Sequence, residues 1–401
     1  MKKIHLIHYG ELALKSGNRK MFEERLATNI RALAAPLGRV RVKRLYGRMI
    51  VEPETEMRAE DLAEVLDRVF GLAYHGEGLM DDASWENLEA LTAEILPEGE
   101  FTFGVRVKRG DQDWVKGRGE TERELGAFVV EMRGWKVNLT DPDIWVQVDV
   151  VNTMVIVSIE KRPGLRGLPQ GVSGQVMALF SGGIDSPAAA FAMMSRGCHI
   201  HAIHFHSAPY TSQESQDKVF ELAQALVRFQ PKMTLHMVPF AKLQQEIVKN
   251  TPAPFRVLLY RRYMLRIAEV MAKKSRCLAL VTGESVGQVA SQTLRNMETV
   301  DDATDMLVLR PLVGTDKEDI IRMAIKAGTY DISILPHEDC CSYLMPKKPA
   351  TRSRIYELER AEKCLDVDDL YWDTIRGIKS YYLRQGAEPK MRVKVEKEES
   401  K

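Results

Sequence analysis

The sequence has few cysteines and no long apolar run, and these two absences exclude several classes of protein. Its 401 residues include five Cys, scattered apart from the adjacent Cys340 and Cys341, so we do not expect a fold built on disulfides. No apolar stretch approaches the roughly 18 residues that a transmembrane helix needs. The N-terminal segment turns polar at Gly10 before the apolar core of a signal peptide develops. We therefore expect a cytoplasmic protein with reduced thiols and no membrane association.

Two familiar nucleotide-binding signatures are also missing. No Gly-Lys pair followed by Ser or Thr is present, which excludes a Walker-type phosphate loop, and no three spaced glycines form a dinucleotide fingerprint. No Cys-x-x-Cys pair occurs, so we do not expect an iron–sulfur cluster held by one chain. The chain, 45% apolar, is nevertheless long enough for two or three domains with substantial cores.

A glycine-rich turn lies between an apolar strand and an apolar helix in the second half of the chain. Residues 176–180 are continuously apolar and predict a buried strand, and Pro187 suits the first turn of the following helix. Between them, Ser181-Gly-Gly-Ile-Asp-Ser186 supplies small residues and free backbone N–H groups at a helix N-terminus. Such a turn is a cradle for phosphate. An ordinary glycine turn in an α/β domain is the alternative interpretation.

The chain is predicted to contain three domains. Strands and helices alternate over residues 175–395, which indicates a doubly wound parallel sheet with its ligand at the carboxyl ends of the strands. Before this domain, the Gly- and Pro-rich residues 166–174 predict a linker. Residues 1–75 predict the strand and helix order of a ferredoxin-like α+β domain, and residues 76–165 predict a second α+β domain. The fold class is therefore α/β, with two α+β domains at the front.

Charge is divided unevenly between neighbouring segments. Residues 1–50 carry twelve Lys or Arg against three Glu, a net charge of +9, although the whole chain has a net charge of only +1. Residues 51–100 carry two Arg against fifteen acidic residues, a net charge of −13. The basic segment is typical of a surface that binds a polyanion such as nucleic acid. The alternative is a solvated face that the acidic segment balances.

Several short segments of the sequence resemble those of one family. The turn at residues 181–186 resembles the PP-loop of the ATP pyrophosphatase superfamily, whose members split ATP between its α and β phosphates and adenylate an oxygen of their substrate. Residues 1–165 resemble the ferredoxin-like and THUMP domains of certain tRNA-modifying enzymes. Five further phrases are similar to the bacterial tRNA sulfurtransferases, or 4-thiouridine synthetases: Ala202-Ile-His-Phe-His-Ser207, Tyr260-Arg-Arg262, the run Thr282 to Thr293, the run Arg310 to Lys317, and Glu338-Asp-Cys-Cys341. Together they extend the resemblance over essentially the whole chain.

The resemblance implies which residues hold ATP. Arg261 would offer two N–H groups to a phosphate, or it would be an ordinary solvated helix charge. Gly283 follows a strand and would let the backbone approach the nucleotide. The complete predicted ATP set is Leu179, Phe180, Ser181, Gly182, Gly183, Ser186, His204, Phe205, Arg261, Gly283 and Gln292.

Two charged residues are predicted to act beside the phosphates. Asp185 is expected to bind or orient Mg²⁺, because a carboxylate in a phosphate cradle would otherwise repel its substrate. A simple helix N-cap is the alternative role for Asp185. Lys317 resembles the family lysine that is needed for activity and would neutralise phosphate charge; otherwise it is an ordinary exposed lysine.

The cysteine pair is predicted to carry sulfur. The Glu-Asp-x-Cys pattern places the family's sulfur-carrying cysteine on Cys341, where a persulfide would be a strong nucleophile once ionised. Basic residues follow shortly afterwards and would favour the anion. Cys340, Cys198 or an external reductant would resolve the persulfide chemistry. A buried, inert cysteine is the alternative.

The resemblance also implies a reaction and its partners. ATP with Mg²⁺ would adenylate O4 of uridine 8, near the acceptor stem of tRNA, and persulfide sulfur would then displace AMP to give 4-thiouridine. The chain is expected to lack the rhodanese extension of some members, so a cysteine desulfurase would supply sulfur. The sulfur-carrier protein of thiamine synthesis is a further expected partner, and a homodimer is expected. The alternatives are adenylation of a small substrate by another ATP pyrophosphatase and a tRNA-binding module without catalysis.

Overall fold

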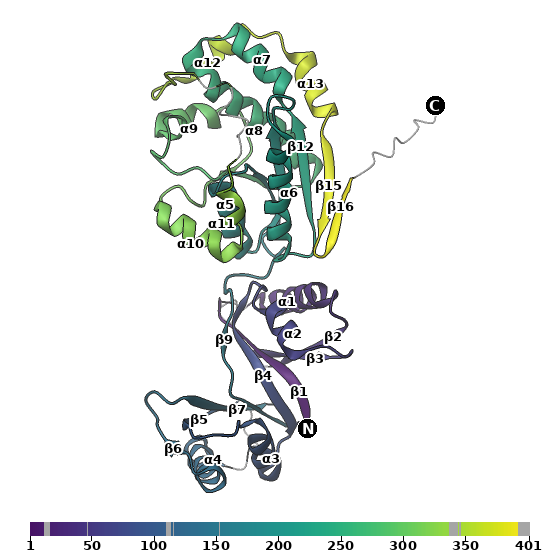
Figure 1. The fold of residues 1–401 in the computed structure, drawn as a ribbon, viewed down its shortest axis with the longest axis vertical. Helices are drawn as coiled ribbons and strands as arrows, with labels where there is room; N and C mark the ends of the chain where they lie inside the picture. The colour runs from purple at the N-terminus through teal and green to yellow at the C-terminus, as the bar shows by residue number, and fades with distance from the viewer. Residues whose placement is uncertain are drawn as a thin grey trace, which may run out of the picture. The chain divides into compact units, whose positions relative to one another are not determined.

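The chain folds into two compact units, Met1–Pro169 and Gln170–Lys401, in a computed structural model (Figure 1). The structure describes residues 1–401 except residues 12–16, 46, 110–113, 115, 152, 337–343, 345 and 392–401. No helix among the described residues is long and apolar enough to cross a membrane.

Unit 1 is built on one nine-stranded sheet with the order β2-β3-β1-β4-β8-β7-β5-β6, and β9 also pairs with β4. Its elements are β1 (Lys2–Tyr9), α1 (Arg19–Ala34), β2 (Val40–Leu45), β3 (Arg48–Pro53), α2 (Ala59–Leu66), β4 (Leu72–Asp82), α3 (Trp85–Ile95), β5 (Thr102–Arg109), α4 (Arg118–Arg133), β6 (Lys136–Val137), β7 (Ile144–Val151), β8 (Met154–Ser158) and β9 (Arg162–Pro163).

Strand β4 joins the two halves of this sheet, because it pairs with β1 on one side and with β8 on the other. The ferredoxin-like half and the second α+β half therefore share a continuous sheet, which the separate strand patterns did not predict. Each half has its own apolar core, one including Leu26 and Ile30 of α1, the other including Leu88 of α3 and Leu125 of α4.

The opposite face of the shared sheet carries a smaller apolar cluster and a buried ion pair. Arg48 of β3 pairs with Asp149 of β7, and both side chains are almost fully buried. Four inter-strand steps separate β3 from β7 in the sheet order, which would be about 19 Å in a flat sheet at a spacing of about 4.8 Å. Only a strongly curved sheet brings these side chains together, so this face of the sheet is concave.

Unit 2 contains a seven-stranded sheet with the order β14-β13-β10-β11-β12-β15-β16. Its elements are β10 (Gln175–Leu179), α5 (Asp185–Ser195), β11 (His199–His206), α6 (Gln213–Val227), β12 (Met233–Pro239), α7 (Ala241–Asn250), η2 (Ala253–Phe255), α8 (Arg256–Lys274), β13 (Ala279–Val281), η3 (Ala290–Gln292), α9 (Leu294–Asp301), β14 (Val308–Leu309), α10 (Lys317–Ala327), α11 (Tyr330–Ser333), α12 (Ile355–Glu362), α13 (Asp368–Arg376), β15 (Lys379–Arg384) and β16 (Ala387–Met391).

The first five strands of unit 2 are parallel, as the alternating pattern predicted, whereas β15 and β16 are antiparallel and extend one edge. The sheet is therefore mixed. From β10 the chain first adds β11 and β12 on one side, then returns to add β13 and β14 on the other. This reversal makes the carboxyl ends of β10 and β13 a topological switch point, the place where open α/β sheets bind ligands. Helices α5 and α6 pack together on the sheet, and α7 packs against α8 (Figure 1).

Candidate active site

The turn between β10 and α5 is closed by its own two serines. The N–H of Ser181 donates to Ser186 Oγ at 2.8 Å, and the N–H of Gly183 donates to Ser181 Oγ at 3.3 Å. Neither Gly182 nor Gly183 has a positive φ, and a Cβ atom on either would meet protein atoms only at 3.5 Å or more. Packing within the protein therefore does not demand these two glycines, whereas the close approach of a phosphate would.

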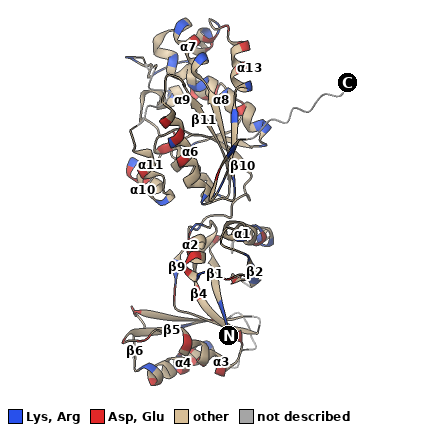
Figure 2. Ribbon diagram, turned by 45° about the vertical axis from the view of Figure 1, so that its right-hand side comes forward, with Lys and Arg blue, Asp and Glu red and all other residues tan. Residues whose placement is uncertain are grey.

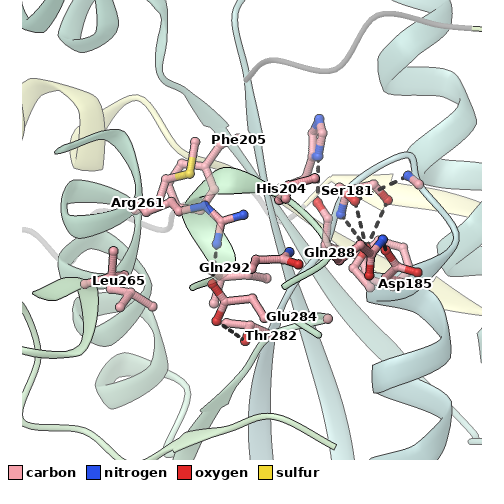
Figure 3. Close-up of a pocket in the computed structure, with 18 residues that line it drawn as sticks. Ser181, Asp185, His204, Phe205, Arg261, Leu265, Thr282, Glu284, Gln288 and Gln292 are labelled. Carbon is pink, nitrogen blue, oxygen red and sulfur yellow. Dashed lines mark hydrogen bonds and ion pairs between the residues drawn. The ribbon is translucent and has the colours of Figure 1, made fainter. Parts of the chain in front are cut away.

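A cavity of about 320 Å³ opens beside this turn at the switch point of the sheet (Figure 3). Its volume is in the range of small-molecule pockets, about 300–1,000 Å³. The structure brings most of the predicted residues together here: the lining includes Leu179, Phe180, Ser181, Gly183, Asp185, Ser186, His204, Phe205, Arg261, Gly283 and Gln292. Gly182 belongs to the turn but does not line the cavity.

Asp185 receives hydrogen bonds on both carboxylate oxygens. Lys317 Nζ lies 2.5 Å from Oδ1, and Gln288 Nε2 lies 2.8 Å from Oδ2. Asp185 stands in the first turn of α5, and Lys317 is the first residue of α10. The N-cap of α5 is Ile184, so Asp185 is not the cap that the alternative interpretation required. Gln288 was not predicted, although it lies within a phrase that carried the family resemblance.

Arg261 is held in the cavity by a buried carboxylate that was also not predicted. Its Nη1 pairs with Glu284, whose other oxygen accepts from Arg310 Nε at 2.7 Å and from Thr282 Oγ1 at 2.9 Å. Burial would raise the pKa of the Glu284 carboxyl, but Arg261 and Arg310 outweigh it and hold that pKa below its ordinary value. Arg261 is thus oriented by a charged partner rather than projecting as a solvated helix charge (Figure 3).

Gly283 is required by contact between two segments of the protein. A Cβ atom there would lie 2.7 Å from both the carbonyl carbon of Asp185 and the nitrogen of Ser186. The segment directly after β13 therefore packs on the first turn of α5, which differs from the predicted reason, the approach of a nucleotide. His204 also has an internal role, because its Nδ1 lies 2.8 Å from the Phe180 carbonyl oxygen and ties β11 to the turn.

Of the cysteines named as candidates for the sulfur chemistry, the structure describes only Cys198. Cys340 and Cys341 lie outside the described residues. Cys198 is buried directly before β11, and burial raises the pKa of its thiol. Phe205, seven residues further along, lines the cavity, so Cys198 lies about 23 Å away at about 3.3 Å per strand residue. Cys198 is therefore at the wrong end of the sheet to resolve a persulfide formed at the cavity.

In unit 1, a cationic cluster surrounds Tyr74 on the concave face of the sheet. The ring of Tyr74 stacks on His8 with centroids 4.3 Å apart. Lys161 Nζ lies 4.5 Å from the Tyr74 centroid, and Lys108 Nζ lies 5.2 Å from it and donates to Tyr74 Oη at 2.5 Å. Burial, together with Lys108, Arg48 and Lys161, lowers the pKa of His8 to about 3, so its ring is neutral at physiological pH. We call these five residues, His8, Arg48, Tyr74, Lys108 and Lys161, the Tyr74 cluster.

Part of the basic segment 1–50 is balanced within unit 1. Lys43 of β2 pairs with Glu52 of β3, and Arg41 of β2 pairs with Glu54, directly after β3. The ribbon of α2 also carries acidic residues, drawn in red (Figure 2). Local ion pairs therefore account for some of the charge asymmetry, whereas the Tyr74 cluster places two lysines, Lys108 and Lys161, against one aromatic ring.

The fold and the site define the class of protein. A parallel core sheet with a Ser-Gly-Gly-x-Asp-Ser turn at its switch point is the PP-loop ATP pyrophosphatase arrangement, here preceded by two α+β halves. Residues 171–367 match the family "Thiamine biosynthesis protein (ThiI)", residues 4–75 match the "ThiI ferredoxin-like domain" and residues 83–160 match the "THUMP domain". The chain belongs to the ThiI family of tRNA sulfurtransferases.

Relatives match this chain over nearly its whole length. A probable tRNA sulfurtransferase of Brevibacillus brevis is 40% identical over 92% of this chain and 94% of its own, and one of Thermoanaerobacter sp. (strain X514) is 38% identical over 91% and 96%. A solved 4-thiouridine synthetase in complex with RNA and bound ATP is 34% identical, with a TM-score of 0.88 over 96% of this chain and 100% of that chain. PH1313 from Pyrococcus horikoshii shares the fold at 18% identity and a TM-score of 0.61, over 81% of this chain and 99% of that chain.

Proposed function

We propose that this protein uses ATP and persulfide sulfur to convert uridine 8 of tRNA to 4-thiouridine. The observation that carries the proposal is the cavity at the switch point, where the phosphate turn, Asp185 with Lys317, and Arg261 with Glu284 converge. Membership of the ThiI family, and the likeness to a 4-thiouridine synthetase solved with RNA and ATP, support the same reaction.

ATP would lie in the cavity with its phosphates at the turn. The N–H groups of the turn and the N-terminus of α5 favour anions, and Lys317 adds a cation. Uridine O4 would attack the α-phosphorus, the bond to the bridging oxygen would break, and pyrophosphate would leave. Arg261, fixed by Glu284, would hold a nucleotide oxygen in place. The product of this step is a uridine with AMP on O4.

Mg²⁺ fits this site in the manner usual for ATP enzymes. One or two carboxylates together with phosphate oxygens commonly hold the ion, and Asp185 is the carboxylate at the turn. When bound, Mg²⁺ would neutralise charge on the phosphates. Lys317 and Gln288, which bond its two oxygens, would hold the Asp185 carboxylate in place at the turn.

Sulfur transfer would follow at Cys341. The terminal sulfur of a Cys341 persulfide would attack C4, AMP would leave with O4, and a disulfide would join C4 to Cys341. A second thiolate, from Cys340 or an external thiol, would then attack Cys341 Sγ and release 4-thiouridine. An external reductant would reduce the resulting disulfide.

The RNA would bind on unit 1. The Tyr74 cluster offers cations for phosphates and an aromatic ring, the combination that RNA-binding surfaces use. Such a surface favours tRNA, bound near its acceptor stem, over a small molecule as the substrate. A cysteine desulfurase is the class of enzyme that would load the persulfide. The same proposal includes sulfur transfer to the sulfur-carrier protein of thiamine synthesis. It also includes a homodimer in which one copy binds the tRNA and the other copy modifies it.

One assay tests the reaction as a whole. The protein is incubated with ATP, Mg²⁺, cysteine, a cysteine desulfurase and unmodified tRNA, and the digested nucleosides are analysed. We expect 4-thiouridine with normal tRNA and none with tRNA that carries cytidine at position 8. Adenylation of a small molecule without any modified nucleoside would favour the rival function.

A further inference from the structure

Lys218 of α6 is a buried lysine whose ammonium group holds a distant segment of the chain. The residue is only 5% exposed. Its Nζ donates to the carbonyl oxygen of Ser333 at 2.8 Å and to that of Leu335 at 2.7 Å. Lysine is almost never buried unless its charge has partners, because desolvation of an unpaired ammonium is costly. Both carbonyl partners lie more than a hundred residues away in the sequence, so this is a specific tertiary contact.

The carbonyl groups that Lys218 binds lie at the end of a helix. Ser333 is the last residue of α11, and Leu335 follows two residues later. The last carbonyls of a helix have no partner within the helix and carry partial negative charge, so a cation stabilises them. Lys218 therefore fixes the point at which the chain leaves α11.

The same side chain lies under the phosphate turn. A Cβ atom on Gly182 would lie 3.6 Å from Lys218 Cδ and 3.9 Å from Cε. Ser333 Oγ donates to the Gly183 carbonyl oxygen at 3.4 Å, which adds a second link between α11 and the turn. Lys218 Nζ would lie 4.0 Å from the same Cβ position, so the end of this side chain lies beside the turn while its ammonium group holds residues 333–335.

Leu335 precedes Cys341 by six residues in the sequence. A segment of six residues spans at most about 20 Å, and Leu335 itself is held by Lys218 beside the phosphate turn. We propose that Lys218 is a positioning residue. It holds residues 333–335, which precede the cysteine pair in the sequence, beside the PP-loop, so that sulfur reaches the adenylated uridine. This inference rests on the proposed function and concerns its second step.

The test separates the two steps of the reaction. Lys218→Met retains an aliphatic stem beneath Gly182 but removes the ammonium group, and Lys218→Arg retains the cation with a different shape. Enzyme loaded with persulfide is mixed with ATP and tRNA in a single turnover, and pyrophosphate and 4-thiouridine are followed separately. Lys242→Met, an exposed lysine on α7, is the matched control.

We expect Lys218→Met to slow 4-thiouridine formation at least ~10-fold, since small misplacements of reacting groups carry such costs. Pyrophosphate release and the KM for ATP should change less than about 3-fold, because the turn keeps its packing. Lys218→Arg should recover part of the loss, and Lys242→Met should match the wild type. If a thermal melt shows that Lys218→Met does not fold, Lys218→Arg is used in its place. We then expect the ratio of the rate of 4-thiouridine formation to the rate of pyrophosphate release to be lower for Lys218→Arg than for the wild type.

Two results would overturn the inference: an equal fall in both rates, which would make Lys218 part of the ATP site, or no fall in either. Failure of the proposed function itself looks different. In that case the wild-type protein makes no 4-thiouridine, whatever residue stands at position 218.

Discussion

Lys317 Nζ lies 2.5 Å from Asp185 Oδ1, although the two residues are 132 positions apart in the chain. The pair joins the N-terminal turns of α10 and α5 at the mouth of the phosphate turn. It places one cation and one carboxylate where the phosphates of ATP are proposed to lie.

Removal of the Lys317 charge should impair activation of the uridine. We expect Lys317→Met to slow tRNA-dependent pyrophosphate release by about 10²–10³-fold, the usual cost of removing one group that stabilises developing charge. Lys326→Met, an exposed lysine in the last turn of the same helix, should behave like the wild type. Equal rates for Lys317→Met and the control would disprove the role of Lys317.

Removal of the Asp185 carboxylate should abolish adenylation while tRNA binding is kept. We expect Asp185→Ala to release no measurable pyrophosphate, because the site loses both its proposed Mg²⁺ ligand and the partner of Lys317. Fluorescence anisotropy with labelled tRNA should give the wild-type Kd. The double variant that combines Asp185→Ala with Lys317→Met should release pyrophosphate no more slowly than Asp185→Ala alone, because the effects of substitutions at two residues in direct contact are not additive. Continued pyrophosphate release by Asp185→Ala would contradict the assignment.

Glu284 should stabilise the folded protein in a pH-dependent way. Its pKa in the folded state is below the ordinary value of 4.5, so its ion pairs stabilise the fold above pH 4.5, and this contribution is lost as the pH falls below 4.5. We expect Glu284→Gln to cost about 3 kcal/mol at pH 7, because Arg261 and Arg310 lose a buried partner. The KM for ATP should rise in parallel, since Arg261 is no longer fixed.

Thermal melts of the wild type and Glu284→Gln between pH 7 and pH 3.5 check this prediction. The difference in Tm should be constant down to about pH 5 and shrink below pH 4.5. The other carboxylates that titrate in the same pH range are present in both proteins, so the difference in Tm between them reports on Glu284. A difference that grows on acidification would have the wrong sign.

The PP-loop was predictable from sequence because its geometry is local. Residues 176–187 place a strand, a glycine turn and a helix in immediate succession, and the structure has β10, the turn and α5 there. The role of Glu284 was not predictable in the same way. Its burial depends on Arg310, 26 residues later, and on Arg261, 23 residues earlier, and no local pattern marks a carboxylate that two arginines will cover.

The shape of unit 1 also lay beyond the local patterns. Strand β4 runs for eleven residues and serves both halves of the sheet, whereas the sequence indicated two separate α+β domains that meet near residue 75. The curvature that brings Arg48 to Asp149 is a property of nine paired strands rather than of any one of them. The antiparallel strands β15 and β16 were missed because their short, partly polar segments lack a strong alternation.

The Tyr74 cluster should contribute to RNA affinity mainly through its charge. We expect Lys108→Ala with Lys161→Ala to weaken tRNA binding and to lower the slope of log K against log salt by about 2, one for each phosphate contact. Lys273→Ala, an exposed lysine of α8 paired with Glu269, should leave that slope unchanged. Titrations of tRNA at several salt concentrations give both values, and an unchanged slope in the double variant would exclude these lysines from the RNA surface.

The most direct test of the whole account is single-turnover thiolation by Cys341→Ser. The variant is mixed with ATP, Mg²⁺, desulfurase, cysteine and unmodified tRNA, and pyrophosphate and 4-thiouridine are measured in the same sample. Cys364→Ser, which alters an exposed cysteine, is the matched control and should behave like the wild type. We predict that Cys341→Ser releases pyrophosphate at nearly the normal rate and forms no 4-thiouridine. Formation of 4-thiouridine by Cys341→Ser would contradict the account.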